Sequence, residues 1–437
     1  MGADFDGLMA EIAALSPTAR IGRVSGITQG RLHVGGLCDI AAAGDRVRIV
    51  SAERDTGGEI LALDRRHATV LAEDAVDGVA IGDAVRHLGP AGIAPADSWV
   101  GRVVDPFGRP LDGRPLLRGP RERPLRSAPP PAAQRRRLGA RLAIGVAVFD
   151  TLLPLVRGQR IGLFAGSGVG KSSLLAKFAR GVEADVVVIA LVGERGRELR
   201  EFTEGVLGPA GLARSVVVAA TSDQSPLVRR RCAWTAMAVA EHFRDQGRQV
   251  LLLVDSVTRF AEAHREVALA GGEEGSLRGY PPSTAQTIMA LAERAGPGLE
   301  GTADITAVFS VLVAGSDMEE PVADILRGSL DGHVVMDRRI AERGRFPAID
   351  LLRSVSRSLP AAADEDENAL IARARQLLGI WDRSEMMVQA GLYTKGTDAM
   401  IDTALKVWPA LDAFLAEDAP GGVADSFARL EACLATR

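Results

Sequence analysis

Apolar and polar residues alternate with different periods along the chain, and the changes of period divide it into four parts. In residues 1–19, apolar positions recur every three or four residues, which predicts a short amphipathic helix. Residues 20–93 consist of short alternating runs that end at Gly or Asp, which is typical of a small β-barrel. Residues 94–358 carry longer apolar runs between helical stretches, and residues 359–437 have a helical period.

The long apolar runs are rich in β-branched residues, as are strands that are buried on both faces of a parallel sheet. They lie at residues 160–165, 185–192, 215–219, 249–254 and 305–312. Because helical stretches separate them, the sequence predicts an α/β core of wound βαβ units. In the last part of the chain, helices are predicted at residues 367–380, 385–390, 398–408 and 423–434.

A connector at residues 94–145 precedes the core and contains a proline-rich segment, residues 128–131, followed by the arginines 135–137. Such an arginine run can form a nucleic-acid patch, but it is more often a solvated segment or part of a subunit boundary. We favour the second interpretation and expect no nucleic acid, in agreement with the net charge of −4.

The composition is that of a soluble globular protein, and 437 residues suffice for two or three domains. Cys38, Cys232 and Cys433 lie far apart and match neither a disulfide framework nor a metal-ligand spacing, so a reducing cytoplasm is the expected setting. No apolar stretch is long enough to span a membrane, and the N-terminus lacks the basic and apolar regions of a signal peptide.

A glycine-rich turn links the apolar run at 160–165 to a helical stretch. The turn and the start of the helix are Gly166, Ser167, Gly168, Val169, Gly170, Lys171, Ser172 and Ser173. Glycines lack a Cβ atom, so their N–H groups can turn toward an anion, and the helix N-terminus adds further free N–H groups. Lys171 would reach the β- and γ-phosphates of a nucleotide, and the Ser172 hydroxyl would ligate Mg²⁺. ATP and Mg²⁺ are therefore the expected ligands.

Only four of the 52 basic residues are lysines, so Lys171 marks a place where a compact ammonium is needed. The strict phosphate-loop motif begins with Gly, whereas this chain has Ala165, which relaxed forms of the motif accept. The alternative is an ordinary glycine turn before a helix, which the order of strand, loop and helix disfavours.

Three charged residues would complete a site for ATP hydrolysis. Asp255 ends an apolar run, where phosphate-loop enzymes place the carboxylate that holds the hydration shell of the metal. Glu194 ends another run and would polarise the attacking water, with an ion pair to Arg195 or Arg197 as the alternative. Arg357 is a candidate arginine finger that would complete a neighbour's site on assembly, or else one of 48 arginines without this role.

Four segments resemble the catalytic subunits of rotary ATP synthases: residues 166–172, 193–198, 251–259 and 330–357. The details are more similar to the type III secretion ATPases, and to the flagellar export ATPase in particular, at residues 159–172, 193–198 and 278–283. The resemblance covers nearly the whole chain. It implies a β-barrel domain, a RecA-like P-loop ATPase core and an α-helical C-terminal domain, assembled as a homohexamer with nucleotide between subunits.

The resemblance also implies roles for individual residues. Arg195 and Arg259 would line the phosphate site, and Arg357 would be the finger that reaches the γ-phosphate bound to the neighbouring subunit. Phe346 and Tyr393 match the aromatic positions that pack on adenine, with plain core packing as the alternative.

Two segments depart from the patterns of these families. Residues 284–289 stand where the resemblance leads us to expect an aromatic residue and a Leu-Pro pair. Residues 368–389 are mixed in charge, whereas a rotary synthase has an acidic lever segment in this domain. The second departure favours an export ATPase over a rotary synthase subunit.

The resemblance therefore implies an ATPase that energises type III protein export for flagellum assembly, in the cytoplasm and peripheral to the export apparatus of the inner membrane. The N-terminal helix would dock a regulator or stator-like protein, or else pack on the body of the protein. The C-terminal helices would meet chaperone–substrate complexes.

Three alternatives to flagellar export remain. The first is an injectisome ATPase, and the second is a RecA-like hexameric RNA translocase. The translocase would stack bases on aromatic residues of its barrel, and residues 20–93 contain no Phe, Tyr or Trp. The third is a non-catalytic binding module, which would lack the set of Lys171, Glu194 and Asp255.

Overall fold

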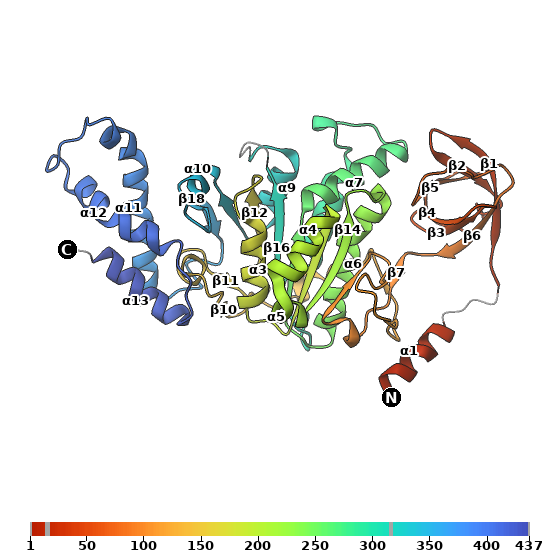
Figure 1. The fold of residues 1–437 in the computed structure, drawn as a ribbon, viewed down its shortest axis with the longest axis horizontal. Coiled ribbons are helices and arrows are strands. Elements are labelled where there is room, and N and C mark those ends of the chain that lie inside the picture. The colour runs from red at the N-terminus through yellow and green to blue at the C-terminus, as the bar shows by residue number, and fades with distance from the viewer. Residues whose placement is uncertain (1, 14–17, 314–317, 436–437) are drawn as a thin grey trace.

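The computed structural model describes residues 2–13, 18–313 and 318–435. A six-stranded barrel, a central sheet flanked by helices and a group of C-terminal helices follow one another along the long axis of the molecule (Figure 1). This arrangement confirms the predicted fold class.

The N-terminal helix α1 (Gly2–Ala13) packs closely against the connector at Gly7. A side chain at this position would not fit, because its Cβ atom would lie 2.9 Å from the Leu117 side chain. Three of its apolar side chains are about half exposed: Leu8, Met9 and Ile12. Residues 14–17, which belong to the predicted amphipathic segment, lie outside the described residues.

The barrel is closed, with the strand order β1-β2-β5-β4-β3-β6. Its strands are β1 (Ile21–Thr28), β2 (Arg31–Gly35), β3 (Arg46–Val50), β4 (Asp55–Leu63), β5 (Ala68–Ala72) and β6 (Ala84–Gly89). Gln29 and Gly30 both have positive φ and form the two-residue turn between β1 and β2. Inward and outward positions alternate, as in β3, where Val47 and Ile49 are fully buried.

The central sheet has eight strands in the order β18-β17-β12-β16-β15-β13-β14-β8. They are β8 (Arg102–Val104), β12 (Arg160–Ala165), β13 (Val186–Glu194), β14 (Ser215–Thr221), β15 (Val250–Asp255), β16 (Ile305–Leu312), β17 (Gly332–Met336) and β18 (Ile349–Ser356). Neighbouring strands are parallel, except that β18 is antiparallel to β17. The five predicted apolar runs correspond to β12 through β16.

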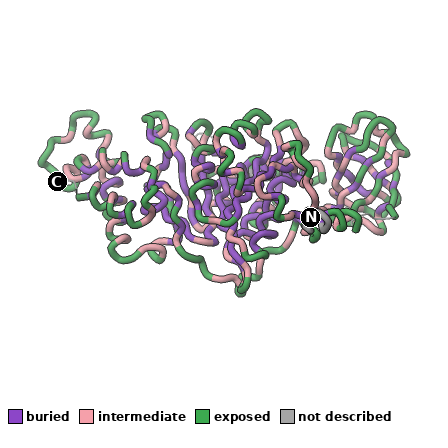
Figure 2. The backbone as a smooth tube through the Cα atoms, turned by 60° about the horizontal axis from the view of Figure 1, so that its bottom comes forward, coloured by how far each residue is buried: buried purple, intermediate pink, exposed green. Residues whose placement is uncertain are grey.

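Helices cover both faces of this sheet, and the buried residues concentrate between them (Figure 2). Along β13, Val187 joins an apolar cluster that includes residues of α3, whereas Val188 joins a second cluster that includes residues of α6. The helices of this part are α2 (Ala147–Asp150), α3 (Lys171–Gly181), α4 (Gly196–Arg200), α5 (Gly208–Ala213), α6 (Pro226–Asp245), α7 (Val257–Ala270), α8 (Ser283–Arg294), α9 (Pro321–Ser329) and α10 (Arg338–Glu342).

The connector is fastened to the core. Its short strands form two pairs: β7 (Gly92–Ile93) with β9 (Arg123–Pro124), and β10 (Arg141–Leu142) with β11 (Leu155–Val156). Arg135 is mostly buried and pairs with Glu293, and Nη2 of Arg136 lies 2.6 Å from Oδ1 of Asp304. The interpretation of the arginine run as a solvated segment is therefore wrong for these two residues, which bind the connector to its own core; a place at a subunit boundary remains a prediction.

Three helices form the C-terminal part: α11 (Glu365–Gln389), α12 (Ala399–Phe414) and α13 (Gly422–Leu434). The predicted break within α11 is wrong, because residues 381–384 contain neither Gly nor Pro and continue the helix. Trp381 of this segment stacks on Trp408 of α12, with the ring centroids 5.1 Å apart. In the part of the chain that the structure describes, no helix combines the length and the apolar character needed to cross a membrane.

Candidate active site

The glycine loop joins the end of β12 to the start of α3 at Lys171. Gly168 and Gly170 have φ angles of 77° and 85°, in the left-handed region that glycine adopts readily. Within the described chain no side chain caps α3, so the N–H groups of its first turn are available to a ligand. A Cβ on Gly168 would meet nothing within 4 Å, which leaves open space at the loop. The loop therefore forms an anion cradle at a helix N-terminus.

The Asp255 carboxylate lies at the end of β15 and is almost completely buried. Its Oδ1 atom contacts the Lys171 ammonium and accepts a hydrogen bond of 2.7 Å from the Ser310 hydroxyl on β16. A buried carboxylate needs such partners, because an unpaired charge in the interior is strongly destabilising. The structure thus brings together the predicted phosphate-binding lysine and the predicted metal-supporting carboxylate.

Ser310 is a residue of this site that sequence reasoning missed. It is fully buried within the apolar strand β16, between β12 and β15. A hydroxyl in a run of buried apolar residues needs a hydrogen-bond partner, and that requirement is a signal in the sequence that points to Ser310, although Thr306 in the same run shares it.

Glu194 ends β13, on the same edge of the sheet as the glycine loop, and two strands, β16 and β15, lie between β13 and β12. The pKa of its carboxyl group is raised to about 7. Burial is the largest cause and the negative charge of Asp255 the next, whereas the Lys171 ammonium opposes the shift. A carboxyl group with a pKa near neutrality can accept a proton from water and release it again. Arg195, one of the two alternative ion-pair partners of Glu194, instead pairs with Glu198 at 3.3 Å.

Two further arginines lie beside Glu194. Arg195 follows it directly, and its side chain is 81% exposed. Arg259 lies in the first turn of α7, where its N–H donates to the Ser256 hydroxyl. A Cβ on Gly193 would lie 3.6 Å from the Cβ of Arg259, so α7 packs against the end of β13. Both arginines are therefore near the candidate base, and their roles at the phosphates remain predictions.

Arg357 lies elsewhere in the chain. It follows β18, whose last residue, Ser356, pairs with Gly332 at the start of β17. The glycine loop begins at the other end of β17, where Met336 pairs with Ala165. Four residues of strand, or about 13 Å, separate the two ends. The exposed Arg357 is thus separated from the glycine loop of its own chain.

The two aromatic candidates differ in position. Phe346 is 50% exposed, and its Cδ1 atom would lie 3.1 Å from a Cβ on Gly170, so the ring stands directly beside the glycine loop. Tyr393 lies between α11 and α12, where its hydroxyl donates to Asp402 at 2.9 Å. The polar contacts of Tyr393 are therefore within the C-terminal helices, and contact with adenine remains a prediction for both residues.

The site fits a nucleotide with Mg²⁺. Among the described residues, no cluster of three or more His, Cys, Asp or Glu side chains could hold a metal alone. Mg²⁺ is usually bound by one or two protein ligands together with phosphate oxygens and water. The exposed Ser172 hydroxyl in the first turn of α3 and the Asp255 carboxylate are suitable ligands of this kind.

Two family models match the chain. Residues 145–356 match the nucleotide-binding domain of the ATP synthase alpha/beta family, and residues 363–432 match the C-terminal domain of the type III secretion ATPase EscN. The fold and the site therefore define a nucleotide-binding ATPase of the ATP synthase class.

Individual relatives match over nearly the full length. The flagellum-specific ATP synthase of Caulobacter vibrioides is 44% identical over 420 residues, which cover 94% of each chain. The type 3 secretion system ATPase of Pseudomonas syringae pv. tomato is 40% identical over 421 residues, which cover 94% of this chain and 92% of the relative. The assembled ATPase EscN from the type III secretion system of enteropathogenic E. coli has a TM-score of 0.88 at 35% identity, over 95% of this chain and 100% of EscN. The chain belongs to the family of type III secretion ATPases that includes the flagellum-specific ATP synthases.

Proposed function

We propose that this protein hydrolyses ATP to energise type III protein export during assembly of the bacterial flagellum. In this proposal it works as a Mg²⁺-dependent ring of six identical subunits with catalytic sites at the subunit interfaces. One observation carries the proposal. The glycine loop, Lys171, Asp255 and Glu194 converge at one end of the sheet, whereas Arg357 lies at the other end.

In the proposed reaction the loop amides and Lys171 bind the phosphates, and the ammonium leaves Asp255 to do so. Ser172 and Asp255 would hold Mg²⁺, which when bound neutralises charge on the β- and γ-phosphates. Glu194 takes the proton of the water that attacks the γ-phosphorus, and the bond to the bridging oxygen of ADP breaks. Arg195 and Arg259 stabilise the charge on the phosphoryl group from the loop side.

Arg357 supplies the remaining positive charge to the neighbouring subunit's γ-phosphate. An arginine finger lowers the transition-state energy because it balances charge that develops on the transferring phosphoryl group. Its distance from the glycine loop of its own chain supports a role in trans. Phe346, and Tyr393 from the C-terminal helices, would pack on the adenine ring.

Partners are assigned to the two ends of the chain. The half-exposed apolar residues of α1 support the docking of a regulator or stator-like protein there. The C-terminal helices would receive the export apparatus and chaperone–substrate complexes. EscN has been solved in complex with its central stalk EscO, which supports a ring that surrounds a stalk protein. The protein would act in the cytoplasm, at the periphery of the inner-membrane export apparatus.

Secretion by a strain that lacks the chain tests the proposal. Plasmid-borne wild-type protein should restore the release of flagellar filament protein into the medium, and Glu194→Gln should not. Restoration of injectisome substrates in place of filament protein would favour the second candidate, an injectisome ATPase, which the 40% identity to a type 3 secretion system ATPase supports. Full filament export by Glu194→Gln would contradict the proposed use of ATP.

A further inference from the structure

Arg357 stands between two buried serines that face into the protein. The Ser356 hydroxyl donates to the Pro154 carbonyl at 2.6 Å. The Ser358 hydroxyl lies 2.8 Å from that of Ser356 and 3.3 Å from the same carbonyl. The residues on either side of Arg357 are thus held inward, and Arg357 itself is exposed.

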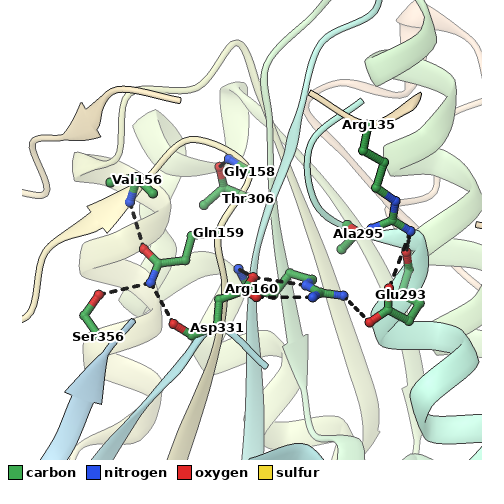
Figure 3. A network of polar contacts seen from close by, with 10 residues as sticks. All are labelled: Arg135, Val156, Gly158, Gln159, Arg160, Glu293, Ala295, Thr306, Asp331 and Ser356. Atoms are coloured by element: carbon green, nitrogen blue, oxygen red, sulfur yellow. Dashed lines mark hydrogen bonds and ion pairs between the residues drawn. The ribbon is translucent and has the colours of Figure 1, made fainter. Parts of the chain in front are cut away.

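Gln159 ties this segment to the start of the phosphate-loop strand (Figure 3). Its side chain is fully buried directly before β12, and its Oε1 atom accepts from the N–H of Val156 at 3.0 Å. Its Nε2 atom donates to the Ser356 hydroxyl and to the Asp331 carbonyl, each at 3.0 Å. The N–H of Arg357 donates to that same Asp331 carbonyl at 3.0 Å. The Gln159 amide therefore bonds to two groups next to Arg357. One is the Ser356 hydroxyl, and the other is the Asp331 carbonyl that accepts the Arg357 N–H.

The Asp331 carbonyl is itself held in place. The Asp331 carboxylate accepts from the backbone N–H of Arg160 at 3.0 Å and pairs with the Arg160 guanidinium at 3.1 Å. The same guanidinium pairs with Glu293 at 2.6 Å, so the network extends to α8 (Figure 3). The buried members of this network are Gln159, Ser356 and Ser358. Buried groups that are all hydrogen-bonded have one favoured arrangement, because any other leaves a buried polar group without a partner.

We infer that Gln159, Ser356 and Ser358 position Arg357 for the active site of the neighbouring subunit. This inference rests on the proposed function, in which Arg357 acts in trans. None of the three residues touches the nucleotide site of its own chain, so they are positioning residues. A long side chain that must meet a phosphoryl group in another protomer needs a fixed base, and a misplacement of about 1 Å lowers turnover by roughly a hundredfold.

The first test replaces both serines with alanine. Ser356→Ala with Ser358→Ala removes two hydroxyls with little change in volume. The kcat should fall by roughly tenfold to a hundredfold, while the KM for MgATP and ring formation in mass photometry stay unchanged. Ser384→Ala with Ser426→Ala is the matched control, because it removes two equally buried hydroxyls that each donate to a carbonyl of their own helix. Gln159→Glu, which keeps the acceptor but removes the donors, is an independent variant with the same expected loss.

Mixed rings then show which side of the interface is damaged. A Lys171→Ala chain has no working glycine loop but offers a normal Arg357 to its neighbour. Mixing it with the serine double variant should restore turnover, because normal loops then meet normal fingers. Mixing the double variant with Arg357→Ala should restore nothing, because both lack a working finger.

The Lys171→Ala and Arg357→Ala pair is the reference mixture. If these two chains fail to restore each other, the shared site is wrong, and this inference falls with it. If they succeed, any of three results overturns the positioning role. The first is a serine double variant with the kcat of the wild type, the second is restoration of its turnover by mixing with Arg357→Ala, and the third is a turnover that mixing with Lys171→Ala does not restore.

Discussion

The Ser310 hydroxyl lies 2.7 Å from Oδ1 of Asp255, the same carboxylate oxygen that contacts the Lys171 ammonium. In the proposed reaction Lys171 leaves Asp255 for the phosphates of the nucleotide, and Ser310 would then remain as the partner that holds the carboxylate in its buried position. In that proposal the serine on β16 supports the metal site without being a ligand itself.

Removal of the Ser310 hydroxyl should therefore weaken the response to the metal. In Ser310→Ala, the Mg²⁺ concentration for half-maximal ATPase activity should rise about tenfold, since a hydrogen bond to a charged group contributes roughly 1.5–3 kcal/mol. A magnesium titration of steady-state turnover measures the shift. Ser426→Ala, which removes an equally buried hydroxyl in α13, should leave the titration unchanged, and an unshifted midpoint in Ser310→Ala would remove the serine from this role.

Glu194→Gln should separate binding from hydrolysis. The amide keeps the shape of the side chain but cannot accept the proton of the attacking water, so kcat should fall at least about a hundredfold. Fluorescent-nucleotide titration should give an affinity close to that of the wild type. Turnover equal to the wild type would exclude Glu194 as the base.

The raised pKa of Glu194 also predicts the pH dependence of catalysis. Because the carboxyl group of the free enzyme has a pKa of about 7, kcat/KM for MgATP should fall as the pH drops below about 7, by roughly tenfold per unit. A profile measured under saturating Mg²⁺ at each pH checks this expectation. A flat profile from about pH 6 to 8 would contradict it.

Stability should change with pH in the opposite direction. Between the ordinary pKa of 4.5 and about 7, the folded state holds a proton on Glu194 that the unfolded state has lost, so this group's stabilising contribution declines as the pH rises through that window. Glu194→Gln should therefore have a higher Tm than the wild type above pH 7, and the difference should vanish near pH 4.5. Thermal denaturation at the two pH values measures it, and an equal Tm at both would contradict the assigned burial of the charge.

Phe346→Ala should weaken nucleotide binding more than chemistry. The half-exposed ring beside Gly170 offers a face for adenine, and its loss should raise the KM for ATP by about tenfold, with kcat little changed. Tyr393→Ala should act in the same direction if both rings hold the base. Unchanged KM values in both variants would leave the rings with a packing role.

The glycine loop, Asp255 and Glu194 could be predicted from sequence because each follows a local pattern. A loop between a strand and a helix, or an acid at the end of an apolar run, places its side chain through nearby backbone alone. Parallel strands bring their carboxyl ends to one edge, so the three elements meet without further information.

Other features depend on contacts between distant segments. Ser310 contacts Asp255 because β16 pairs with β15, and Gln159 contacts Ser356 because β12 and β18 both pair with β17. The arginines 135 and 136 looked like a free basic run because their acidic partners lie more than 150 residues further along the chain. Their contacts became visible only in the folded structure.

Specific ATPase activity measured against protein concentration, with mass photometry on the same samples, tests the shared site most directly. Activity per chain should be low for dilute monomers and should rise in proportion to the fraction of chains in rings, with Arg357→Ala rings remaining inactive. Monomers that hydrolyse ATP as fast per chain as assembled rings would contradict a site completed by the neighbouring subunit.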